Sequence, residues 1–151
     1  MTAAAEADFV SGYERGIEVR PVTIAGLRLH APLLAVAVTC FVGTVVTDLC
    51  YQGSDGNLLW LNSSTWLLAA GIAFGLVAFV LMLIDAARGL NRIAALLLFI
   101  VLIEELFNSL IHARDGWTAV VPTGFLLSIV GAVLALLTGW LARAPTERSR
   151  A

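Results

Sequence analysis

Charge is the scarcest property of this 151-residue sequence: charged side chains make up 13% of it, against 60% hydrophobic ones. Soluble domains carry about 25% charged residues, so this chain has too little polar surface to face water on all sides. The mean hydropathy of +0.92 points the same way. These values exclude an ordinary soluble domain and predict that lipid surrounds much of the chain.

Lysine is absent, and all nine basic residues are arginine. The formal net charge of −2 leaves no basic surface of the kind that nucleic-acid-binding proteins use, so no nucleic-acid partner is expected. The arginine-only composition, rich in alanine and leucine, is typical of a GC-rich bacterium. Residues 1–30 lack an early basic cluster and an apolar run, so they do not predict a cleaved signal peptide.

Catalytic and redox motifs are missing too. The sequence has no GxSxG, HExxH, P-loop or CxxC pattern, so no catalytic residue is predicted and an enzyme is not the favoured interpretation. The two cysteines, Cys40 and Cys50, lie ten residues apart in one apolar segment. On a helix this spacing is about 15 Å of rise, which is beyond the reach of a disulfide.

The sequence does contain four apolar segments, at about residues 31–51, 65–84, 93–111 and 120–141. Each approaches the ~20 residues that a helix needs to cross the ~30 Å hydrocarbon core of a bilayer. Short polar links predict an all-α, antiparallel bundle of four transmembrane helices. Residues 62–65 offer an N-cap for the second helix. The fourth helix is expected to begin at Thr118 or Pro122. Residues 1–30 are interpreted as an arm and residues 143–151 as a tail, both outside the membrane.

The arginines predict how the bundle is oriented. Eight of them fall in the arm, the second link and the tail, which share one side of the membrane, and only Arg114 falls on the other. Because cytoplasmic loops are enriched in basic residues, both termini are expected in the cytoplasm, with the bundle in the inner membrane of a bacterium. Trp60, Trp66 and Trp117 mark the opposite, outer face.

Small residues at helical spacing indicate faces on which helices approach closely. Gly71 and Gly75 form such a pair in the second apolar segment, and Gly131 and Gly139 lie in the fourth. These glycines predict packing within the bundle or, alternatively, a homo-oligomer interface.

Two acidic residues, Glu104 and Glu105, lie about midway along the third apolar segment. Neighbouring helical residues point about 100° apart, so the two side chains are expected to point in different directions, at least one of them toward another helix. Two ionised carboxylates this deep in a membrane would be costly, so at least one is expected to be protonated at neutral pH. The pair is either a proton site or metal ligand, or an interhelical hydrogen-bonding pair.

Further polar residues gather toward the outer end of the predicted bundle. Asp48 lies near the end of the first apolar segment, Asn108 and His112 follow the glutamates along the third, and Arg114 and Asp115 occupy the next turn. We expect these residues to converge. They would form either a small polar pocket open to the outer surface or a network that caps the helices and sets their register.

The second histidine, His30, lies at the cytoplasmic boundary, where it is expected to pair with Asp85. His30 and His112 would be about one bilayer apart, roughly 30 Å, so a single chain cannot ligate a bis-histidine haem with them. Asp48, His112 and Asp115 could offer metal ligands, but their spacing matches no specific metal motif. No haem, metal or other cofactor is therefore predicted.

The sequence also resembles a known family. The run HARDGWTAVVPTG at 112–124 is similar to a stretch in the bacterial membrane proteins labelled domain of unknown function 2231. Further similar features are His30 followed by the Asp48-Leu49 pair, the WLLAAG run at 66–71, Asp85, and the GWL run at 139–141. The resemblance covers about residues 29–141 and implies four membrane helices without an assigned activity. One departure is that the family often has His-Pro where this chain has His30-Ala31-Pro32.

Two functions from different classes are compatible with these features. The favoured one is a non-enzymatic membrane subunit, anchor or scaffold for a membrane or periplasmic protein partner. The alternative is a redox- or proton-linked membrane component, with its cofactor or proton site in the outer half of the bundle. A solute channel is a third interpretation, which would require a homo-oligomer because four helices rarely enclose a pathway.

Overall fold

The structure, a computed structural model, describes residues 23–24, 27–114 and 120–143. Four long helices dominate it: α2 (His30–Gly53), α3 (Leu58–Ala87), α4 (Arg92–His112) and α6 (Phe125–Arg143). The short η1 (Val120–Gly124) precedes α6, and the two-residue strands β1 (Thr23–Ile24) and β2 (Leu27–Arg28) form an antiparallel hairpin before α2. All four spans, with η1 joined to α6, are long and apolar enough to cross a membrane. The predicted all-α architecture of four transmembrane helices is thus confirmed.

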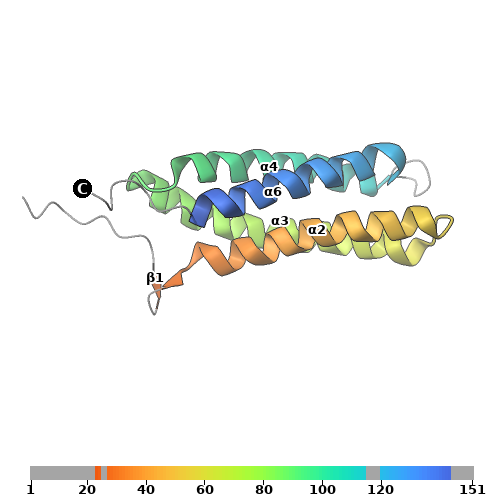
Figure 1. Ribbon diagram of the computed structural model, residues 1–151, viewed down its shortest axis with the longest axis horizontal. Coiled ribbons are helices and arrows are strands. Elements are labelled where there is room, and N and C mark those ends of the chain that lie inside the picture. The colour runs from red at the N-terminus through yellow and green to blue at the C-terminus, as the bar shows by residue number, and fades with distance from the viewer. Residues whose placement is uncertain (1–22, 25–26, 115–119, 144–151) are drawn as a thin grey trace, which may run out of the picture.

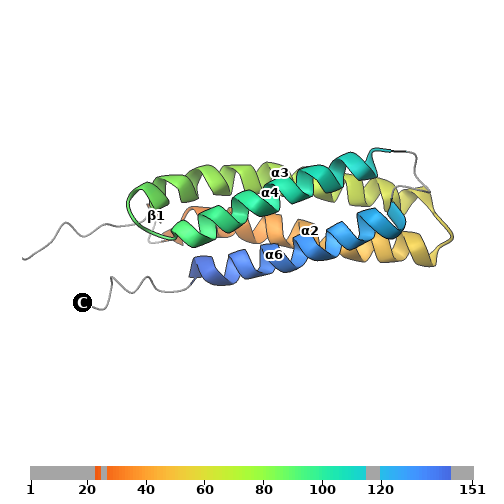
Figure 2. The same ribbon diagram turned by 90° about the horizontal axis from the view of Figure 1, so that it is seen from above.

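The helices alternate in direction along the chain because short links join them (Figure 1). α2 packs against α3 and α6, and α4 packs against the same two helices, so the four helices surround a common interior (Figure 2). Among the described residues, one end of the bundle carries Arg28, Arg88, Arg92 and Arg143, and it is called the arginine-rich end below. The opposite end, called the far end, carries Arg114.

The second helix begins earlier than predicted. α3 starts at Leu58, and Asn57 is its N-cap, with the side-chain oxygen accepting a 3.0 Å hydrogen bond from the Leu59 N–H. The predicted N-cap within residues 62–65 is therefore wrong. Ser63 and Thr65 instead donate to carbonyls one turn earlier in the same helix, at 2.9 Å and 3.0 Å, which is how hydroxyls are accommodated inside a helix.

The fourth helix begins in two steps. Pro122 lies in η1, where Val121 has an extended backbone (φ −116°, ψ 124°), and the regular helix starts at Phe125. Thr118, the other predicted opening residue, lies outside the described residues.

Apolar side chains fill the interior from the arginine-rich end to about the middle of the bundle. The first cluster lies nearer that end and is built around Leu34, Met82 and Leu98. A second cluster lies beyond it and consists of Ala37, Phe41, Leu68, Val101 and Ala135. Large apolar side chains are also exposed on the outer faces of all four helices, where a bilayer would solvate them.

Two of the predicted packing glycines lie inside the bundle. A Cβ on Gly71 would collide with the ring of Phe41, and one on Gly75 would come within 2.9 Å of Leu102 Cδ2. Both glycines are buried, so they let α3 approach α2 and α4 closely. This face of α3 is consequently occupied within the chain and is not available to a second copy.

Candidate functional site: a buried polar cluster

Polar side chains from all four helices meet in the interior toward the far end. We call this set the polar cluster. Its members are almost completely buried, at 0–3% exposure. The cluster comprises Asp48 of α2, Ser64 of α3, Glu105, Asn108 and His112 of α4, and Ser128 of α6.

Asp48 lies at the centre of the cluster and contacts the three other helices. Its Oδ1 accepts a 2.6 Å hydrogen bond from Ser64 Oγ and lies 3.1 Å from His112 Nε2. Its Oδ2 accepts a 2.6 Å hydrogen bond from Ser128 Oγ. Asp48 therefore joins α2 to the three other helices through its two carboxyl oxygens.

Both nitrogens of the His112 ring face acceptors. Nδ1 lies 3.0 Å from the backbone carbonyl oxygen of Asn108, and Nε2 faces the Asp48 carboxyl. A carbonyl can only accept, so Nδ1 carries a hydrogen. The second contact then needs one further proton, held either by Nε2 or by Asp48. In either form the pair has no net charge, which makes its burial at the membrane interior tolerable.

Asn108 connects this pair to the glutamates. Its side-chain Nδ2 donates to Ser128 Oγ at 3.0 Å and to Glu105 Oε2 at 3.1 Å. Because the Ser128 hydroxyl donates to Asp48, its oxygen is available to accept from Asn108. A continuous series of hydrogen bonds therefore runs from Asp48 through Ser128 and Asn108 to Glu105.

Glu104 and Glu105 both reach Gly131 on α6. A Cβ built on Gly131 would collide with Glu105 Oε1 and with Glu104 Oε2, so the two carboxyls are neighbours. The expectation that they point in different directions is wrong, because flexible glutamate side chains can bring their ends together although their Cβ atoms diverge. Gly131 leaves the space that both carboxyls occupy.

The carboxyl groups of Glu104 and Glu105 have few hydrogen-bond partners among the described residues. Both oxygens of Glu104, Glu105 Oε1 and Asn108 Oδ1 are buried and have no hydrogen-bond partner among the described residues. Leaving such groups unpaired in an apolar interior is expensive, and most of all for a charged group. Carboxyls that bind a proton reduce this cost.

The other predicted site residues lie elsewhere. Arg114 is exposed at the far end, and Asp115 lies outside the described residues. His30 and Asp85 meet at the arginine-rich end, where Nδ1 of His30 is 3.1 Å from Oδ2 of Asp85 and both side chains are buried. His30 and His112 are thus at opposite ends of the bundle. The described residues contain no group of three or more His, Cys, Asp or Glu that could hold a metal ion.

Sequence reasoning did not assign the two serines to the site. Ser64 lies within residues 62–65, the predicted N-cap of the second helix, and Ser128 lies in the fourth apolar segment. Both are buried at 0% exposure and donate to Asp48. Their presence in apolar membrane helices is a signal that could have identified them, because a serine there hydrogen-bonds either to its own helix backbone or to another helix. Ser128 does both, since its Oγ also lies 3.1 Å from the Gly124 carbonyl oxygen.

The polar cluster ends inside the bundle. Glu105 lies seven residues before His112, about 10 Å along α4. Beyond it, toward the arginine-rich end, the interior is filled by the apolar cluster that includes Phe41, Leu68 and Val101. The cluster therefore occupies one half of the bundle.

Comparison with known proteins supports the membrane assignment. A family described as predicted membrane protein (DUF2231) matches residues 26–144. No protein of curated function and no solved structure matches the chain.

Proposed function

The chain belongs to the DUF2231 family of predicted membrane proteins, and we propose that its polar cluster binds and releases protons. On this proposal the protein is a proton-linked membrane component. Its proton-binding groups are the Asp48–His112 pair and the neighbouring Glu104 and Glu105 carboxyls. The observation that carries the proposal is the meeting of both glutamate carboxyls at Gly131, with buried oxygens that lack partners among the described residues.

The hydrogen bonds around Asp48 connect it to the residues beside Glu105. Hydroxyl groups can accept a proton on one side while donating on the other, and Ser128 lies between the Asp48 carboxylate and the Asn108 amide. An amide relays protons poorly, so Asn108 positions Glu105 rather than conducting to it. The Asp48–His112 pair and the glutamate pair are accordingly two neighbouring proton sites.

The apolar interior limits what this site can do. Since Phe41, Leu68 and Val101 fill the bundle beyond Glu105, the other members of the polar cluster lie on the far-end side of the glutamates among the described residues. This arrangement supports proton storage or exchange at one face. It does not support a conducting path through a single bundle.

Infrared titration of the carboxyl groups tests the proposal. We expect a protonated carboxyl band at neutral pH that decreases in Glu104→Gln and Glu105→Gln and is unchanged in Asp55→Asn. Asp55 is a matched control because it is exposed in the link between α2 and α3. A spectrum with both glutamates ionised at neutral pH would refute a proton site.

A purely structural role is the second candidate. Asp48 binds side chains of α3, α4 and α6 at once, and interhelical hydrogen bonds of this kind hold membrane bundles together. Such a bundle would suit a membrane subunit, anchor or scaffold. Affinity purification in mild detergent should then recover a stoichiometric partner or a homo-oligomer, and recovery of the chain alone as a monomer would count against this role.

We also propose the location and orientation. The arginine distribution supports an inner membrane of a bacterium, with the arginine-rich end in the cytoplasm. In a variant without Cys40 and Cys50, the substitution Asp55→Cys should give a thiol that reacts with a membrane-impermeant maleimide in intact cells. The thiol of Ala87→Cys should react only after lysis, because Ala87 is exposed beside the arginine-rich end. The reverse pattern would invert the topology.

A further inference from the structure

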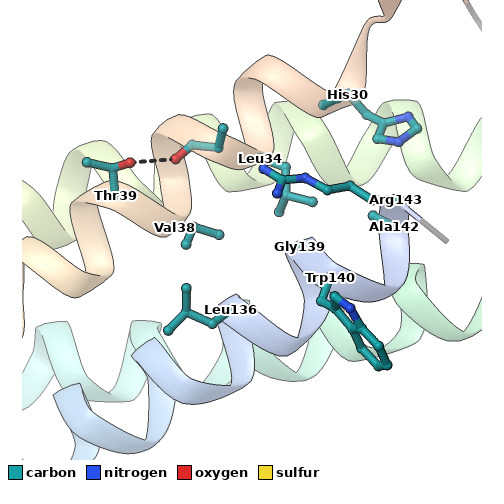
Figure 3. Close-up of a pocket in the computed structure, with 11 residues that line it drawn as sticks. His30, Leu34, Val38, Thr39, Leu136, Gly139, Trp140, Ala142 and Arg143 are labelled. Carbon is teal, nitrogen blue, oxygen red and sulfur yellow. Dashed lines mark hydrogen bonds between the residues drawn. The ribbon is translucent and has the colours of Figure 1, made fainter.

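A groove lies between α2 and α6 near the arginine-rich end, well away from the polar cluster (Figure 3). Its volume is about 250 Å³. Gly139 keeps it open, because the nearest atom to a Cβ built there is Val38 Cγ2, at 3.8 Å. The deeper lining is largely apolar and includes Leu34, Val38 and Leu136. The groove is thus shaped for a hydrocarbon chain along part of its length.

Cationic and polar groups surround the mouth of the same groove. The side chain of Arg143, the last residue of α6, extends from α6 toward Leu34 of α2 (Figure 3). His30 also lines the groove, is 1% exposed, and has no partner for Nε2 among the described residues. Its Nδ1 contacts Asp85, so Nε2 can donate to a phosphate when the ring carries both hydrogens.

The start of α2 adds a third favourable feature. α2 begins at His30 without a side-chain cap, and the first N–H groups of a helix carry a partial positive charge. His30 and Ala31, the first two residues of this helix, both line the groove. The N-terminus of α2 and the Arg143 guanidinium therefore both border the groove, which favours a phosphate group. The buried His30 ring lies beside them, and its Nε2 has no partner among the described residues.

We propose that this groove binds one anionic phospholipid. The phosphate contacts Arg143 and the start of α2, and one acyl chain lies over Gly139 between α2 and α6. A lipid is favoured over free phosphate because the polar mouth continues into an apolar groove. Trp140 is 71% exposed beside it, as is common at the membrane interface, and basic pockets between membrane helices bind anionic headgroups.

Native mass spectrometry of the full chain from nanodiscs tests this proposal. The nanodiscs contain phosphatidylcholine alone or phosphatidylcholine mixed with phosphatidylglycerol. We expect the wild type to retain phosphatidylglycerol in preference to phosphatidylcholine. Arg143→Gln should reduce this retention about tenfold, because it removes a charge-assisted hydrogen bond. Gly139→Leu should reduce it similarly by filling the groove.

Two variants serve as controls. Arg114→Gln removes an exposed arginine at the far end, and Val133→Leu enlarges a residue on α6 that is 51% exposed. Both control variants should retain lipid like the wild type. Circular dichroism checks that Gly139→Leu is folded. If that variant is not folded, Gly139→Ala takes its place. Equal retention of the two lipids by the wild type, unchanged retention in Arg143→Gln, or release of the lipid by inorganic phosphate would each overturn the proposal.

Discussion

Ser128 Oγ on α6 donates a 2.6 Å hydrogen bond to Asp48 Oδ2 on α2, and the two residues are 80 positions apart in the chain. This contact joins the first and last membrane helices at a buried point. It also places the Asp48 carboxylate within reach of His112 and Ser64. The four helices consequently share one polar centre, and the stability of the bundle should depend on it.

Removing the Asp48 carboxyl should destabilise the bundle. Asp48→Ala leaves two serines and His112 without their buried acceptor, so we expect the free energy of unfolding to fall by about 2–4 kcal/mol. Reversible unfolding in mixed SDS and mild detergent measures this change. Thr39→Ala is the control, because Thr39 is exposed and its hydroxyl bonds within its own helix. An equal loss in both variants would show that Asp48 has no special role.

An added methyl group at Gly131 should displace both glutamate carboxyls. Gly131→Ala places a Cβ against the carboxyl ends of Glu104 and Glu105. Because these flexible side chains can shift, we expect the loss of unfolding free energy to lie at the low end of the overpacking range, about 1 kcal/mol. Gly139→Ala, whose Cβ would make an ordinary 3.8 Å contact, should have little effect. Adding Glu104→Ala and Glu105→Ala should restore part of the loss in Gly131→Ala. Equal stability of the two glycine variants would contradict the observed packing.

A similar test applies at the contact between α2 and α3. Gly71→Ala would place its Cβ in the ring of Phe41, so we expect a loss of about 1–3 kcal/mol in unfolding free energy. Gly53→Ala is the matched control, since the space around a Cβ at Gly53 is open to 4 Å. Comparison of the two in the same unfolding assay isolates the packing effect. A Gly71→Ala variant as stable as the control would argue that α2 and α3 lie further apart than the contact between Gly71 and Phe41 indicates.

The His30–Asp85 pair should couple the start of α2 to the end of α3. A double-mutant cycle with His30→Ala and Asp85→Ala should give a coupling energy of about 0.5–3 kcal/mol, because the two side chains are in direct contact. The matched pair His30→Ala and Asp55→Ala should be additive, since Asp55 lies at the far end. Additivity in the first cycle would mean that the 3.1 Å contact contributes nothing to stability.

Several features of the fold could be predicted from the sequence because they depend on local composition. In lipid, four segments of about 20 apolar residues can form all their backbone hydrogen bonds only as helices. The short links between them require the helices to alternate in direction. The position of His30 and Asp85 at the ends of adjacent helices also made their contact predictable. Helix starts were harder, because several polar residues near Asn57 could each act as an N-cap.

The composition and periodicity of the chain by themselves determined that it lies in a membrane and forms four helices. They also identified Asp48, Glu104, Glu105, Asn108 and His112 as polar residues in apolar surroundings. Only the tertiary structure decided how these residues meet, since the rotation of each helix sets which side chains face inward. It placed Ser64 and Ser128 against Asp48, and it brought both glutamates to Gly131. The polarity of a residue can be predicted from the sequence because it is a local property. The meeting of these residues could not be predicted, because it requires four helices to pack in one register.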